Sequence, residues 1–380
     1  MYNAICSVTQ NVVLKNENII SVIPSGTAIQ NARTSAIGDT FARDESNHLS
    51  YGAGRYIASM SLVSVLTGRD MSTMTWKPSD NGFTYKLTEK EISICKESVA
   101  NAISNPLEIT KSKHPPLPTN LSDMFDGEGT EANPYLIQSA EDMWKLSGYT
   151  KGKSFTDTNT YFMLTTDIDL SADNWVPICA SAESGWVSTP NSFNGNFDGN
   201  GKTITFKGNY TGDTWAKGLF SAIGGYVHDL IIKGEINIEK GRVGALASMA
   251  ITGAKIENIT SYVNITAGNN QVGGIVGYIN TDNVTLTNCV NHGTVTGRQL
   301  VGGIVGGGFK NTAYINCENY GTVTATNVEA GGIVGEIYAS ATLTNCKNTG
   351  VVKAGSTIAT SDTGTEEAYA GNLVGHKYNK

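Results

Sequence analysis

Two acidic residues, Asp44 and Glu45, stand four and three residues before His48. A carboxylate that orients an imidazole, which in turn takes a proton from a serine hydroxyl, is the arrangement of nucleophilic ester hydrolysis. The spacing suggests His48 as a base with Asp44 as its acid, or Glu45 in its place. The alternative is a loop histidine beside solvated acids. Ser25 precedes Gly26 after an apolar run and is interpreted as a structural turn residue rather than a nucleophile.

Two other motifs suggest ligand chemistry but are incomplete. Gly201-Lys202-Thr203 resembles the end of a phosphate-binding loop, but position 196 is Asn where that loop needs Gly. The segment 198–201 begins like a calcium loop, but its twelfth position is Asn209 rather than Glu. We therefore interpret 198–201 as a turn. Two interpretations remain for three nearby acids, Asp167, Asp169 and Asp173: they bind a cation loosely, or they are ordinary turn residues. No cofactor and no metal ligand are predicted.

The composition limits the class of protein. The chain has 380 residues, 43 of them glycine, with 16% charged residues and a net charge of -7. A nucleic-acid-binding protein would show a basic surface, and this chain is mildly acidic. No apolar run approaches the 18 or so residues that a membrane-spanning helix needs. The length indicates two or three domains, and the chain is expected to be a monomer.

The candidate acid and base lie in a region of mixed helical and strand patterns, residues 1–110. Helices are expected at 1–13, 53–66 and 89–104, and the apolar run 19–23 predicts a buried parallel strand. A proline-rich linker, 111–126, follows this region.

The second half of the chain repeats itself. A Val-Gly-Gly-Ile-Val-Gly sequence at 272–277 returns at 301–306 and, with Ala first, at 330–335. A period near 29 residues, with short β-branched runs and glycine turns, predicts one solenoid coil per repeat. The fold class is therefore mainly β: a parallel β-solenoid resembling a right-handed β-helix over 127–380. A short helix capped by Ser139 is expected to cover its open end.

Stacked coils place equivalent side chains in ladders through the interior. One predicted ladder comprises Phe220, Leu246, Ile275, Ile304, Ile333 and Leu373, and a second comprises Leu230, Ile259, Cys289, Cys317 and Cys346. The cysteines of the second ladder are interpreted as small buried hydrophobic residues. The polar stretch 355–367 lengthens one repeat and is expected to protrude as a loop.

The repeats, with the lead-in at 127–137 and the segments 167–170 and 193–203, resemble the GLUG motif of bacterial secreted and surface proteins. The resemblance covers about 127–380. It implies an exported protein whose repeats bind or space rather than catalyse. Adhesion to a glycan or to a host surface is then the expected role.

The segments 23–33 and 44–50, with Gly54-Arg55-Tyr56, resemble the C-terminal third of an SGNH-type hydrolase, a flavodoxin-like α/β esterase. The resemblance implies that His48 is the catalytic base. The family's serine and oxyanion groups would lie upstream of Met1, so 1–110 is expected to be a truncated α/β segment that is inactive alone. The alternative function is a serine esterase acting on glycans when that upstream half is present. The missing signal peptide is expected to have been lost with it, which places the protein outside the cell.

Overall fold

The computed structural model describes residues 2–39, 41, 49–50, 52–76, 87–116, 118–180, 190–210, 216–309, 311–364 and 369–378. The chain divides into two compact units, Met1–Leu117 and Pro118–Lys380. The catalytic candidates Asp44, Glu45 and His48 lie outside the described residues.

The described part of the first unit is helical. It contains α1 (Tyr2–Asn11), α2 (Ser25–Arg33), α3 (Ala53–Thr67) and α4 (Glu89–Ser104), with short 3-10 turns η1 (Val13–Lys15) and η2 (Met71–Thr73). Apolar side chains of α2, α3 and α4 form one buried cluster that includes Ala28, Ala32, Ile57, Met60, Cys95 and Val99. The helices expected at 53–66 and 89–104 are confirmed.

Two local expectations for this unit are wrong. Residues 19–23 are not a strand, and the side chain of Ile20 is 98% exposed. A parallel strand needs a neighbouring strand to share its hydrogen bonds, and the described residues of this unit form none. Ser25 is the first residue of α2 rather than a turn residue. A helical segment therefore stands where a flavodoxin-like α/β segment was expected.

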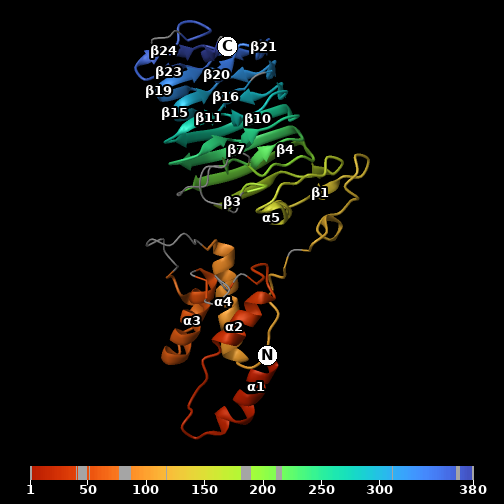
Figure 1. The fold of residues 1–380 in the computed structure, drawn as a ribbon, viewed down its shortest axis with the longest axis vertical. Coiled ribbons are helices and arrows are strands. Elements are labelled where there is room, and N and C mark those ends of the chain that lie inside the picture. Colours follow the sequence, from red (N-terminus) through yellow and green to blue (C-terminus); the bar gives the residue numbers. More distant parts are fainter. Residues whose placement is uncertain are drawn as a thin grey trace. The chain divides into compact units, whose positions relative to one another are not determined.

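The second unit is a parallel β-solenoid, as the repeats predicted (Figure 1). Strand β7 (Tyr226–Ile238) pairs in parallel with β4 (Asn196–Tyr210) before it and β10 (Lys255–Ala267) after it. Farther along, Val272 pairs with Val301, one repeat later in the sequence. Each coil thus hydrogen-bonds to the next, which removes internal sheet edges.

Two sheets are seen among the described residues. The larger comprises β1 (Tyr135–Ile137), β2 (Tyr161–Leu164), β3 (Ile168–Asn174), β4, β5 (Ala216–Lys217), β7, β8 (Arg242–Gly244), β10, β11 (Asn270–Gly273), β13 (Thr285–Thr287), β14 (Val290–Asn291), β15 (Val295–Gly302), β17 (Ala313–Ile315), β18 (Glu318–Asn319), β19 (Val323–Gly331), β21 (Thr342–Thr344), β22 (Lys347–Asn348), β23 (Val352–Ala354), β24 (Thr357–Ile358) and β25 (Ala370–Gly371). The smaller comprises β6 (Phe220–Ile223), β9 (Ala247–Ala250), β12 (Val276–Ile279), β16 (Val305–Gly307), β20 (Val334–Tyr338) and β26 (Val374–Tyr378).

The interior consists of side-chain ladders, with one shift from the expected register. Phe220 pairs with Ala247, so Leu219 rather than Phe220 is level with Leu246. The degenerate first repeat has a single glycine before its leucine, so aligning the repeats by their first glycine shifted this repeat by one residue. In the cysteine ladder Cys289 and Cys317 are buried as predicted, whereas Cys346 is half-buried.

Both ends of the solenoid differ from its middle. Helix α5 (Ala140–Thr150) begins as predicted, with the Ser139 hydroxyl accepting a hydrogen bond from the Asp142 amide. The polar stretch near the C-terminus does not simply protrude. Its residues 361–364 lie along the last coil, where the amides of Leu373 and Val374 donate to the carbonyl of Asp362. These bonds pair backbone amide groups of the last described coil. Within the described residues no helix is long and apolar enough to cross a membrane.

Candidate functional site

A column of left-handed residues follows one turn of the solenoid. Asp229, Asn258 and Asn288 have φ of 54°, 53° and 53°, and the column continues through Asn316 and Asn345. Asn and Asp adopt this conformation more readily than other non-glycine residues. Each asparagine amide donates to the side chain one coil earlier: Asn288 to Asn258 at 2.9 Å, and Asn258 to Asp229 at 2.7 Å. Asp229 is thus the acceptor at which this ladder ends.

A bulge in β4 opens a hollow where the ladder ends. Asp198 pairs with His228 and Lys202 with Leu230, so the three residues 199–201 of β4 lie opposite the single residue Asp229. The hollow measures about 280 Å³ and is lined by Asp198, Asn200, Gly201, Asp229, Leu230, Ile231 and Asn258.

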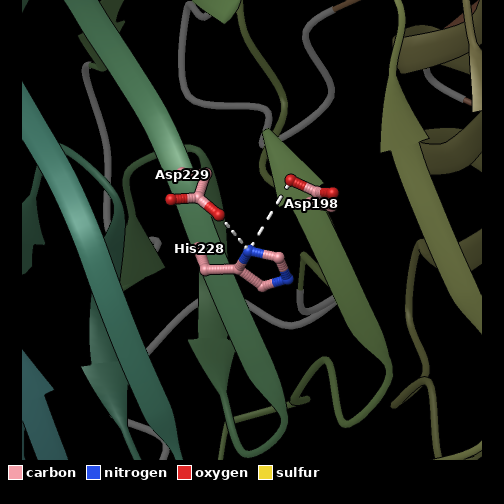
Figure 2. Close-up of side chains that lie close together, drawn as sticks. All are labelled: Asp198, His228 and Asp229. Carbon is pink, nitrogen blue, oxygen red and sulfur yellow. Dashed lines mark hydrogen bonds and ion pairs between the residues drawn. The ribbon is translucent and has the colours of Figure 1, made fainter. Parts of the chain in front are cut away.

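Three side chains with metal-binding or proton-transfer chemistry, Asp198, His228 and Asp229, lie close together (Figure 2), and two of them, Asp198 and Asp229, line this hollow. His228 Nδ1 lies 2.7 Å from Asp229 Oδ2 and 3.6 Å from Asp198 Oδ1. Neighbouring strand residues normally point to opposite faces, but the left-handed conformation of Asp229 brings its side chain beside that of His228. Burial opposes ionisation of Asp229, but hydrogen bonds from His228 and Asn258 hold its pKa below the usual value. We call Asp198, His228 and Asp229 the ladder-end cluster.

A second cluster lies near the C-terminal end of the solenoid. It joins Glu329 of β19, Glu336 of β20 and His376 of β26. Glu329 is buried, accepts a hydrogen bond from Gln299 at 2.7 Å and lies 3.3 Å from His376 Nδ1. Burial, together with the negative charge of Glu329, raises the pKa of Glu336 to about 7.

Aromatic rings surround this second cluster on the outer face of the smaller sheet. Glu336 pairs with His376 and Tyr338 with Tyr378 across β20 and β26. The ring of Tyr338 lies 5.3 Å from those of Phe309 and Tyr378, and the His376 ring lies 4.3 Å from that of Tyr378. We call the group formed by Phe309, Glu336, Tyr338, His376 and Tyr378 the aromatic–acid surface.

Neither cluster was predicted from the sequence. The sequence placed Asp198 in an incomplete calcium loop or a turn, whereas the structure places 198–201 in a bulge within β4, where Asp198 Oδ1 accepts a hydrogen bond from the Asn200 amide at 2.6 Å. The signal that could have found the cluster is the repeat itself, which sets Asp198 and His228 about one coil apart. The repeat does not align Asp198 with His228 directly, because the bulge adds residues to the coil that contains Asp198.

The comparisons with known proteins found one family model and several relatives that match part of this chain. Residues 1–98 match a family described as a domain of unknown function, DUF4886. Halomucin of Haloquadratum walsbyi is 30% identical over 174 residues, which cover 44% of this chain and 2% of halomucin. The "Putative Gly-rich membrane protein" of Evansella cellulosilytica is 31% identical over 202 residues, covering 42% of this chain and 21% of that protein. The chain therefore spans a small part of these relatives.

One solved structure has a related fold. The "putative immunoglobulin A1 protease" of Bacteroides ovatus aligns with a TM-score of 0.51 and 19% identity, over 69% of this chain and 88% of its own. At that identity the likeness concerns the fold alone.

Proposed function

We propose that this is an exported, surface-associated bacterial protein whose solenoid binds an extracellular glycan or host-surface ligand. The names of halomucin and of the Gly-rich membrane protein support a surface location. The resemblance of the repeats to the GLUG motif supports the same location and a binding role. No nucleic acid is expected as a partner, because the chain is acidic overall, with a net charge of -7.

The aromatic–acid surface is the observation that carries the proposal. Aromatic side chains offer apolar faces with a polar edge, a combination suited to the mixed polar and apolar surface of a sugar. Carboxylates accept hydrogen bonds from hydroxyl groups, and Glu336 pairs with His376 on the neighbouring strand, two residues from the Tyr338–Tyr378 pair. Tyr378 is 38% exposed, so its ring is accessible to a ligand.

The test is a glycan-array screen followed by titration calorimetry with the best ligand. Replacing Tyr378 by Ala removes one ring, and the loss of about 0.5–1.5 kcal/mol for an aromatic contact predicts an affinity several-fold to about tenfold lower. Glu336→Gln keeps the shape but removes the charge, and it should also weaken binding.

A matched control is Tyr262→Ala, because Tyr262 is 45% exposed and stacks on His292 away from the proposed surface. Equal affinity of wild type and Tyr378→Ala, or an equal loss in Tyr262→Ala, would contradict the proposed location of the site.

We propose a second, separate role for the N-terminal unit: Asp44 or Glu45 with His48 supplies the acid and base of an SGNH-like ester hydrolase. The resemblance assigns no nucleophile to this chain, and both a nucleophile and an oxyanion hole are needed. Hydrolysis of p-nitrophenyl acetate by the chain alone should therefore stay at background, unchanged by His48→Ala. Rapid turnover that His48→Ala abolished would instead assign the nucleophile to a serine of this chain.

A further inference from the structure

We propose that the ladder-end cluster is a binding site for a divalent metal ion that accepts nitrogen and oxygen ligands, such as Zn²⁺. The ligands are Asp198, His228 and Asp229. The site lies on β4 and β7, whereas the aromatic–acid surface lies on the smaller sheet, so the two proposals can fail independently.

The spacing of the donor atoms fits one ion. Zn²⁺ binds imidazole nitrogen and carboxylate oxygen at about 2.0–2.2 Å, which separates two tetrahedral ligands by about 3.4 Å. His228 Nδ1 and Asp198 Oδ1 are already 3.6 Å apart. The 2.7 Å between His228 Nδ1 and Asp229 Oδ2 is a hydrogen bond, which would lengthen as the metal replaces the shared proton. The three donor atoms all lie within 4.8 Å of one another.

The charge balance also favours a cation. Two carboxylates converge on one imidazole nitrogen in Figure 2, which concentrates negative charge at the site. A divalent ion compensates that charge. Imidazole with carboxylates suits Zn²⁺ better than Ca²⁺, which prefers a shell of oxygens only.

Outer contacts hold the ligands in place. The Asn258 amide donates to Asp229 Oδ1 at 2.7 Å, which leaves Oδ2 directed at His228. The Asn200 backbone amide fixes Asp198 Oδ1 at 2.6 Å. Such hydrogen bonds to ligands orient them and contribute to metal affinity.

The bulge gives the ion room and access. A Cβ added at Gly199 would lie 2.4 Å from the Asp229 carbonyl oxygen, so only glycine fits where β4 passes the cluster. The side chains of Asp198 and Asp229 are 33% and 43% exposed, and the hollow of about 280 Å³ beside them has space for water as a further ligand.

The experiment is titration calorimetry of the full chain, without an affinity tag and stripped with a chelator, against ZnCl₂ and separately against CaCl₂. We expect Zn²⁺ binding with one equivalent assigned to the cluster and much weaker Ca²⁺ binding. Asp198→Asn and His228→Gln should each weaken that Zn²⁺ site at least tenfold, in line with the loss of a ligand. Asp198→Asn retains the acceptor for the Asn200 amide, so it preserves the turn.

Two controls separate this site from other binding. His292→Gln removes an exposed histidine outside the ladder-end cluster, and His376→Gln disrupts the cluster of Glu329, Glu336 and His376. Neither substitution should affect Zn²⁺ binding at the ladder-end cluster. Melting temperatures of the metal-free variants check that the fold is kept. Unchanged Zn²⁺ stoichiometry and affinity in Asp198→Asn and His228→Gln would overturn the proposal. So would Ca²⁺ binding as tight as Zn²⁺ binding and insensitive to His228→Gln.

Discussion

At the scale of single residues, a buried amide ladder runs through the C-terminal coils. The Asn291 amide donates to Asn319 at 2.8 Å, that of Asn319 to Asn348 at 2.7 Å, and that of Asn348 to Asn372 at 2.9 Å. Asn291 and Asn319 are 0% and 1% exposed. Burying a polar group costs little folding free energy only while its hydrogen-bond partners are present. Each asparagine of this ladder therefore depends on the asparagines of the neighbouring coils.

Replacing Asn319 by Ala should therefore lower the free energy of unfolding by about 2–4 kcal/mol, because it removes three buried hydrogen bonds, to Asn291, Asn348 and the carbonyl of Gly321. Chemical denaturation followed by circular dichroism measures the change. Asn237→Ala, at an exposed position, is the control and should stay within about 0.5 kcal/mol of wild type. Similar small effects in both variants would show that the ladder does not stabilise the fold.

Glu336 predicts a specific pH dependence. Its pKa of about 7 in the folded protein exceeds that of an exposed glutamate, so the folded state binds the extra proton. The raised pKa of Glu336 therefore contributes to the free energy of unfolding. This contribution is fully present below the unfolded-state pKa and is lost as the pH rises through about 7. The facing groups are Glu329, His376 and Tyr378.

Glu336→Gln mimics the protonated carboxyl group, so its melting temperature should exceed that of wild type at pH 8 and approach it at pH 5. Differential scanning calorimetry across this range checks the trend. A difference between variant and wild type that is the same at both pH values would show that Glu336 does not titrate between them.

At the scale of elements, the solenoid depends on its apolar ladders. Ile304 is 0% exposed and lies between Ile275 and Ile333 in successive coils. Ile304→Asp should destabilise the chain by several kcal/mol, because it buries an unpaired carboxylate. Thr266→Asp, on an exposed position of β10, serves as the control and should alter the denaturation midpoint little. Equal midpoints for the two variants would contradict the ladder assignment.

At the scale of the whole molecule, the two units have separate cores. The buried cluster of the first unit comprises side chains between Ala28 and Ala102, while the solenoid interior is formed by its own coils. A chain of residues 118–380 should fold alone, with a β-type circular dichroism spectrum and cooperative melting. A spectrum dominated by helix, or one typical of an unfolded chain, would contradict this independence.

Periodicity alone determined the solenoid. A repeat of about 29 residues dictates where corners and strands recur, since each coil buries its apolar positions against the next. The Ser139 cap of α5 could also be predicted, because capping depends on local residue types. The apolar run 19–23 led to a wrong prediction of a strand, because a strand forms only if another strand pairs with it.

Only the tertiary structure decided which polar side chains meet. Asp198 and His228 lie about one coil apart in sequence, and the bulge at 199–201 sets which of their neighbours share a face. Glu329, Glu336 and His376 come from three strands, and the long repeat before His376 displaces it from any fixed spacing. Their convergence follows from the stacking of coils and the left-handed turns, which fix side-chain direction in space. Residue types and their order along the chain do not specify that direction.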